Sequence, residues 1–236
     1  MKARLLALVL LAAAPRACVV YEYEHEFWLR VDGSGSVNVS GRPALWRAFK
    51  GLPVAADADP EALRRAARSL FDGAGLRVNR VTVTRRDGRP ILFVAADFTE
   101  LNRLAGSAAF PDLTLDLRRA AGRLELEGVW QRPEGLPDPG AEARAGLMAV
   151  RFHLPSKVYS HRDAVEGVQR GNIVAWRQEV ARATSGGRLE LGASLDDRSI
   201  LGSTVTLFAA VIVLALCLLG LALWLTARRG RRQAAG

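Results

Sequence analysis

The amino-acid sequence predicts an α+β fold with a mainly antiparallel sheet of hairpins, two or three helices and one C-terminal transmembrane helix. Segments in which apolar and polar residues alternate are typical of half-buried strands, and short turns such as Asp87-Gly88 connect them. Helical patterns interrupt these hairpins, which favours α+β over an all-β architecture. Residues 200–227 contain no charged side chain, and a helix of this length can span a bilayer.

The first predicted hairpin covers residues 21–40. Apolar and aromatic residues occupy the odd positions from 21 to 31, and acids occupy most of the even ones. The turn is DGSG at residues 32–35, and a returning strand follows it. His25 lies on the apolar side of the first strand, so we expect a hydrogen-bonded interior histidine rather than a metal ligand.

Two helices are predicted after this hairpin. Residues 43–50 form a short helix, with proline in its first turn and Gly51 at its end. The second helix begins after Asp59 as N-cap and ends at Gly73. Its arginines, on the face opposite the apolar stripe, are expected to be solvated, although contact with anionic lipid headgroups is an alternative.

The remaining strands follow in a second group. Strands are expected at 76–84 and 91–96. Residues 91–94 are apolar at odd and even positions alike, which favours a central strand covered on both faces. A helical turn at 98–104 precedes a hairpin of 113–117 with 124–130. Residues 131–146 are rich in proline and glycine and indicate a loop or a subdomain joint. Extended segments are expected at 147–154, 172–176 and 188–195.

The N-terminal residues 1–18 have the pattern of a signal peptide. Lys2 and Arg4 precede an apolar run at 5–14, which is too short to span a bilayer. Cys18 raises the alternative of lipidation. Of the three residues before it, only Ala17 matches the small and branched apolar residues that usually precede a lipidated cysteine, so lipidation of Cys18 stays open.

The C-terminal residues predict the topology. The stretch 200–227 is expected to be a transmembrane helix, because a helix that is apolar on every face requires lipid or a much larger core. The tail 228–236 follows, and by the positive-inside rule its arginines place it in the cytoplasm. Residues 19–199 then form an extracytoplasmic domain of a single-pass protein of the cell membrane. The orientation rests on Arg228, Arg229, Arg231 and Arg232.

The basic composition comes mostly from the two ends. The chain has 236 residues and a formal net charge of +9, with 33 cations and 24 acids. Seven cations and no acids lie in residues 1–18 and the tail, so 26 cations face all 24 acids in the rest. The domain between the ends is nearly neutral, and we expect no nucleic-acid partner.

The sequence contains no established catalytic pattern, including the nucleophile elbow, the HExxH zinc motif, the Walker loop and the Rossmann glycine pattern. His153 and His161, with Asp163 and Glu166 nearby, suggest a metal site only weakly, since they are expected in a strand and a loop. Asp97 and Glu100 are explained by a helix N-cap with an acid three residues later. We therefore expect no catalytic residue, no metal and no cofactor.

Aromatic residues are the remaining candidates for a binding site. A sheet beside helices can enclose an apolar pocket for a lipid, but the same side chains also fill a core. Both interpretations stay open at this stage. The residues concerned are Trp46, Phe71, Phe93, Trp130, Phe152 and Trp176.

Several short segments together resemble the LppM-type domain family of bacterial membrane-anchored lipoproteins. They are the strand directly after Cys18, the turn at 32–35, FHLPSKV at 152–158, GNIVAW at 171–176, and a last amphipathic strand that continues into a C-terminal helix with a basic tail. The resemblance implies an α+β extracytoplasmic domain, a binder of lipid or of another envelope component, with no established reaction. The departure at Pro15-Arg16 puts the family's lipid anchor in doubt.

The expected function is non-enzymatic binding of an envelope lipid or protein partner by a membrane-anchored domain. Two alternatives remain: a structural component of a membrane protein complex, and an envelope enzyme that carries no recognised motif. The expected partners are the membrane itself and a lipid or an envelope protein.

Overall fold

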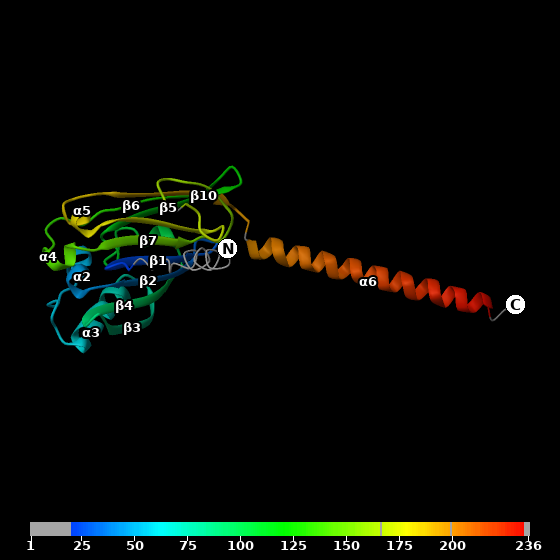
Figure 1. Ribbon diagram of the computed structural model, residues 1–236, viewed down its shortest axis with the longest axis horizontal. Coiled ribbons are helices and arrows are strands. Elements are labelled where there is room, and N and C mark those ends of the chain that lie inside the picture. Colours follow the sequence, from blue (N-terminus) through cyan, green and yellow to red (C-terminus); the bar gives the residue numbers. More distant parts are fainter. Residues whose placement is uncertain (1–19, 166, 199, 234–236) are drawn as a thin grey trace, which may run out of the picture.

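Two β-sheets and several helices form the domain that precedes the C-terminal helix (Figure 1). The computed structural model describes residues 20–165, 167–198 and 200–233. The predicted signal segment and Cys18 lie outside the described residues. The α+β prediction is confirmed.

The larger sheet has six strands in the order β3-β4-β2-β1-β7-β9. The parallel pair β1 and β7 aligns Tyr23 with Met148, and all other neighbours in this sheet are antiparallel. This pair joins segments about 125 residues apart, which a hairpin pattern cannot show. The strands are β1 (Tyr23–Leu29), β2 (Gly35–Gly41), β3 (Arg77–Arg86), β4 (Arg89–Phe98), β7 (Leu147–His153) and β9 (Ile173–Glu179).

The smaller sheet has four antiparallel strands in the order β5-β6-β10-β8. Its strands are β5 (Leu113–Ala120), β6 (Arg123–Trp130), β8 (Val158–His161) and β10 (Leu189–Asp196). Strand β8 corrects the prediction of a loop around His161. Four residues are too few for an alternating pattern to be recognised in sequence.

The helices are α2 (Pro43–Lys50), α3 (Pro60–Asp72), η1 (Leu101–Arg103), α4 (Ala141–Arg144), α5 (Val180–Thr184) and α6 (Ile200–Gln233). Helix α2 has the predicted bounds and ends at Gly51, whose φ of 67° is left-handed. Helix α3 begins as predicted, because the Asp59 side chain accepts from the backbone N–H groups of Glu61 and Ala62. The short helices α4 and α5 were not predicted, and α4 lies inside the predicted loop.

Two predictions around strand β4 are wrong. Asp97 is the penultimate residue of β4 and pairs with Arg77, and Glu100 pairs with Arg103 at 2.7 Å, so neither side chain makes the predicted helix cap. The strand is also not covered on both faces. Leu92 is buried, whereas Phe93 on the other face is half-buried beneath Arg80, 4.9 Å from its ring centroid.

The core lies between the inner face of the larger sheet, helices α2 and α3, and the smaller sheet. Strand β1 alternates between buried and half-buried residues along its whole length. Aromatic rings pack within and between the layers. The ring centroids of Phe27 and Phe152, on neighbouring strands of the larger sheet, are 4.6 Å apart, and Phe49 of α2 meets Trp130 of the smaller sheet edge-on at 4.9 Å. The domain therefore has one continuous core.

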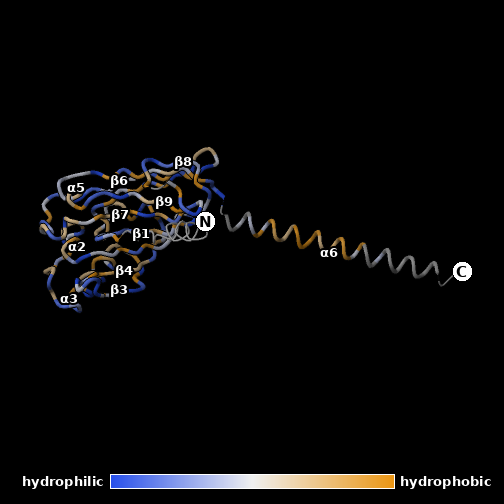
Figure 2. The backbone as a smooth tube through the Cα atoms, viewed as in Figure 1, coloured by the Kyte–Doolittle hydropathy of each residue, from blue (hydrophilic) through white to orange (hydrophobic). Residues whose placement is uncertain are grey.

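Helix α6 extends away from the domain (Figure 1). Its residues Thr204–Leu221 have a mean hydropathy of 2.7, and none of this window is buried against the rest of the protein. The apolar band is visible in the middle of the helix in Figure 2. By length and composition α6 can cross a membrane.

Candidate functional site

The end of the domain from which α6 leaves brings together several loops, which we call the anchor end. It comprises the β1–β2 turn (30–34), the β5–β6 turn (121–122), the segment 154–157 and residues 196–198. The Asp196 N–H donates to Lys157 O at 2.9 Å. Arg119 lies 3.4 Å from both Val31 O and Asp197 Oδ2, so one side chain connects the first turn to the root of α6.

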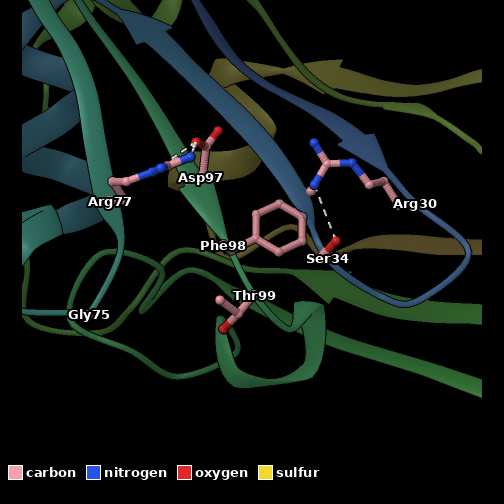
Figure 3. Close-up of a pocket in the computed structure, with 8 residues that line it drawn as sticks. Arg30, Ser34, Gly75, Arg77, Asp97, Phe98 and Thr99 are labelled. Atoms are coloured by element: carbon pink, nitrogen blue, oxygen red, sulfur yellow. Dashed lines mark hydrogen bonds and ion pairs between the residues drawn. The ribbon is translucent and has the colours of Figure 1, made fainter.

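An open hollow of about 580 Å³ lies at this end of the larger sheet (Figure 3). Its volume is within the range of small-molecule sites, roughly 300–1,000 Å³. The β1–β2 turn, the end of β4 and the start of β3 supply its walls. The lining residues are Arg30, Ser34, Gly35, Gly75, Arg77, Asp97, Phe98 and Thr99.

The two arginines of the hollow have different partners (Figure 3). Arg77 is paired with Asp97, and its Nε lies 3.1 Å from Oδ2. Hydrogen bonding from Arg77 holds the pKa of Asp97 below its usual value. Among the contacts of the described residues, the Arg30 guanidinium donates only to the Ser34 hydroxyl, at 3.3 Å. Its guanidinium keeps donors that a ligand carboxylate or phosphate can use.

The turn beside Arg30 is held by a short local network. Asp32 Oδ1 accepts from the Ser34 N–H at 3.0 Å and from the Ser34 hydroxyl at 2.7 Å. These two hydrogen bonds lower the pKa of Asp32. Gly33 has a φ of 83°, which a glycine adopts without strain. The backbone of the turn is therefore held in one conformation, and this conformation positions Arg30 at the hollow.

A ring forms the apolar part of the hollow. Phe98 lies against Gly35, and a Cβ at Gly35 would approach Phe98 Cζ to 2.7 Å and Trp28 O to 2.2 Å. Glycine at position 35 is therefore required for the ring to lie across the strand. The hollow combines a guanidinium, hydroxyl groups and an aromatic ring, which suits an anionic or polyhydroxyl group with an apolar neighbour.

A second cluster of polar groups lies in the core. Lys50 Nζ lies 3.0 Å from Asp112 Oδ1, and the other oxygen of Asp112 accepts from Trp130 Nε1 at 3.0 Å. His25 Nε2 lies 3.6 Å from the same Oδ2 and 3.3 Å from the Tyr23 hydroxyl. All five side chains are buried, so the cluster belongs to the core and is closed to solutes.

Burial controls the ionisation of this cluster. Desolvation lowers the pKa of His25 well below 6.5, and the neighbouring Lys50 lowers it further. Desolvation also raises the pKa of Asp112 and lowers that of Lys50, while the attraction between the two opposes both changes. His25 is thus the interior, hydrogen-bonded histidine that its strand position predicts. No sequence pattern singles out Asp112, which lies outside every predicted element.

The predicted aromatic residues all lie within the folded domain. Trp46, Phe71, Trp130 and Phe152 are fully buried and Trp176 is 1% exposed, whereas Phe93 is half-buried on the outer face. The five buried rings belong to the continuous core cluster. The structure brings some of them together in pairs. The ring centroids of Trp46 and Phe71 are 6.0 Å apart, and those of Phe152 and Trp176 are 6.2 Å apart.

The histidines considered as metal ligands lie on different sheets. His153 Nε2 lies 2.8 Å from Glu26 Oε1, and its ring stacks on Trp28 at 4.7 Å. His161 is the last residue of β8 and pairs with Ala193 of β10. Asp163 follows in the loop, and Glu166 lies outside the described residues. Within the described ranges, no three potential ligands come together as a metal site.

The arginines of the tail continue the last helix. Arg228, Arg229, Arg231 and Arg232 all fall within α6, whose backbone is helical to Gln233. The predicted boundary between a span at 200–227 and a tail is therefore not a boundary in secondary structure.

Comparisons with known proteins found similarity in structure. No protein-family model matches the chain, and no curated protein matches its sequence. The NMR structure of the folded domain of LppM from Mycobacterium tuberculosis is similar, with 17% sequence identity and a TM-score of 0.44. The match covers 78% of this chain and 94% of the LppM chain. The α+β class therefore rests on the described sheets and helices themselves.

Proposed function

We propose that this protein is a membrane-anchored extracytoplasmic module that binds the headgroup of an envelope lipid, without catalysis, in the hollow of Figure 3. The observation that carries the proposal is the shared location of the hollow and the root of α6 at the anchor end. A ligand site beside a membrane helix lies where lipid headgroups are concentrated.

The connection to α6 is short. Strand β10 ends at Asp196 and α6 begins at Ile200, so four Cα steps of at most about 3.8 Å separate them. The Cα atom of Asp196, at the anchor end, therefore stays within roughly 15 Å of that of Ile200. A domain on such a tether samples the membrane surface rather than the surrounding solution.

The side chains of the hollow support headgroup binding. Arg30 offers donors for a phosphate, and the hydroxyl group of Thr99 suits a polar headgroup. The ring of Phe98 provides an adjoining apolar surface. Binding of this kind requires shape and a few placed polar groups, and no reacting side chain.

The experiment uses the full-length chain purified from membranes and native mass spectrometry of the lipid it retains. The wild-type protein is expected to retain a lipid with an anionic headgroup. Arg30→Ala removes a charge-assisted contact worth about 1.5–3 kcal/mol, so the affinity for the lipid is expected to fall about tenfold or more and the amount of retained lipid to fall with it.

The matched control is Arg65→Ala on the exposed face of α3, which removes one surface arginine outside the hollow. This variant is expected to retain lipid as the wild type does. Equal lipid occupancy in the wild type and Arg30→Ala would contradict the proposed site. An empty wild-type protein that instead crosslinks to one membrane protein would favour the structural component of a complex.

A further inference from the structure

A group of exposed side chains next to the root of α6 is separate from the hollow. Tyr159 of β8 is 47% exposed, and its ring is flanked by two cations. The Arg123 guanidinium lies 4.6 Å from the ring centroid, and Lys157 Nζ lies 5.5 Å from it. We call these three residues the Tyr159 cluster.

The Tyr159 cluster is joined directly to the last strand before the membrane helix. The Tyr159 hydroxyl donates to Asp196 Oδ2 at 2.9 Å, and Lys157 O accepts from the Asp196 N–H. Asp196 is four residues before Ile200. Covalent geometry keeps Asp196 within roughly 15 Å of Ile200, and these hydrogen bonds keep the cluster beside Asp196, whatever angle the helix takes.

The local charge is positive. Arg119, Arg123, Lys157 and Arg198 face two carboxylates, those of Asp196 and Asp197. Asp197 is paired with Arg119, and Asp196 is engaged by Tyr159 and by the Arg198 N–H. Within the described part of the chain, Arg123 and Lys157 have no carboxylate at ion-pair distance. Two exposed cations therefore remain available to a partner.

We propose that the Tyr159 cluster docks the domain onto anionic headgroups of the bilayer that α6 spans, and so fixes the orientation of the domain on the membrane. The inference rests on the proposed anchoring by α6 and is independent of what occupies the hollow. An exposed tyrosine between two cations matches the composition of membrane interfaces, where aromatic rings lie at headgroup level and basic residues contact phosphates.

The chemistry favours a lipid surface over a protein partner. The two cations lie at the anchor end, from which α6 leaves the domain. The membrane that α6 spans is therefore the partner that is always within reach. Each Lys or Arg near an anionic surface strengthens the contact about fivefold. Removal of both is therefore expected to weaken docking about 25-fold.

The test is a distance-sensitive measurement on the full-length chain in nanodiscs. A single fluorophore is attached at Ser160→Cys, an exposed position next to Tyr159, in a chain carrying Cys18→Ala and Cys217→Ala. Nanodiscs contain either phosphatidylcholine alone or 30% phosphatidylglycerol, each with a trace of headgroup spin-labelled lipid. We expect stronger quenching with phosphatidylglycerol and loss of that difference in Arg123→Gln/Lys157→Gln.

Matched controls separate docking from general charge effects. Arg64→Gln/Arg65→Gln on α3 removes the same charge and is expected to keep the lipid-dependent quenching. A fluorophore at Glu134→Cys, in the loop after β6 at the opposite end of that strand, is expected to show no dependence on lipid. Salt of about 1 M should abolish the difference in the wild type, because it screens exposed charges.

The outcomes are distinct. Equal quenching in the two lipids, or a difference that persists in Arg123→Gln/Lys157→Gln, overturns the docking proposal. Loss of the difference in the α3 control also overturns it. A wild-type chain that does not enter nanodiscs contradicts the anchoring itself. A wild-type chain that retains no lipid in the hollow but still shows the phosphatidylglycerol-dependent quenching contradicts only the proposed function.

Discussion

Lys50 and Asp112 form an ion pair of 3.0 Å with both side chains fully buried in the core. The pair joins the end of α2 to the segment before β5, and Lys50 also lies 4.2 Å from the centroid of the Phe110 ring. Two charges withdrawn from water are tolerated only when each keeps its partners. The pair therefore fixes how α2 packs against the smaller sheet.

Removal of one member of this pair is expected to be costly. Asp112→Asn leaves the Lys50 ammonium without its counter-charge, and Lys50→Met leaves a buried carboxylate, so each is expected to lower the free energy of unfolding by about 3–5 kcal/mol. Chemical denaturation of the full-length chain in nanodiscs measures this. The double variant should cost less than the sum of the two. Additive costs would show that the charges do not interact.

Protonation of His25 is expected to make the domain less stable at acidic pH. Its pKa is well below 6.5 in the folded protein, so the unfolded chain binds the proton more readily. The stability that neutral His25 contributes is complete above pH 6.5 and is lost as the pH falls through that value towards the folded pKa. Denaturation between pH 7.5 and 5.5 should show this slope in the wild type.

The matched variants for this slope are His25→Gln and His161→Gln. The first removes the buried imidazole and should flatten the dependence of unfolding free energy on pH in this window. The second removes an exposed imidazole on β8 and should leave the wild-type slope in place. A slope that survives in His25→Gln would assign the effect to other groups.

Two phenylalanines on opposite faces of the larger sheet should respond differently to truncation. Phe152 is fully buried and stacked on Phe27, so Phe152→Ala is expected to cost about 3–5 kcal/mol. Phe93 is half-buried, and its truncation should cost clearly less. Thermal unfolding of both variants checks the difference, and equal costs would mean that the outer face is also covered.

The orientation of α6 is testable with a reporter fused after Gly236. The four arginines at its C-terminal end predict a cytoplasmic tail, because basic residues remain on that side of the membrane. A phosphatase reporter, which folds only outside the cytoplasm, should be inactive there, and a fluorescent protein that requires the cytoplasm should be active. The reverse pattern would invert the topology and place the domain inside.

Local signals accounted for the elements that the sequence predicted well. Asp59 with Pro60 defines the start of α3, and the proline at position 43 with Gly51 defines both ends of α2. These caps depend on residues within one helical turn of each other, so they can be recognised from the sequence alone. Strand β8 was missed because its four residues carry no alternating pattern, and its place depends on pairing with β10.

The candidate site depended on tertiary contacts that sequence reasoning did not supply. Arg30, Arg77 and Asp97 come from three separate strand ends, and only the register of β2, β3 and β4 brings them to one hollow. The Lys50–Asp112 pair has the same origin, since the two residues are 62 positions apart. The capping pattern at Asp97 and Glu100 was misleading because nearby arginines compete for both carboxylates.

The position of β10 also determines how the domain responds to mechanical force. This strand lies between β6 and β8 and is held by β6 along all eight of its residues. If α6 is held in a membrane, as proposed, a pull on the domain along β10 strains its hydrogen bonds to β6 together rather than one at a time, so the junction between the domain and α6 resists detachment.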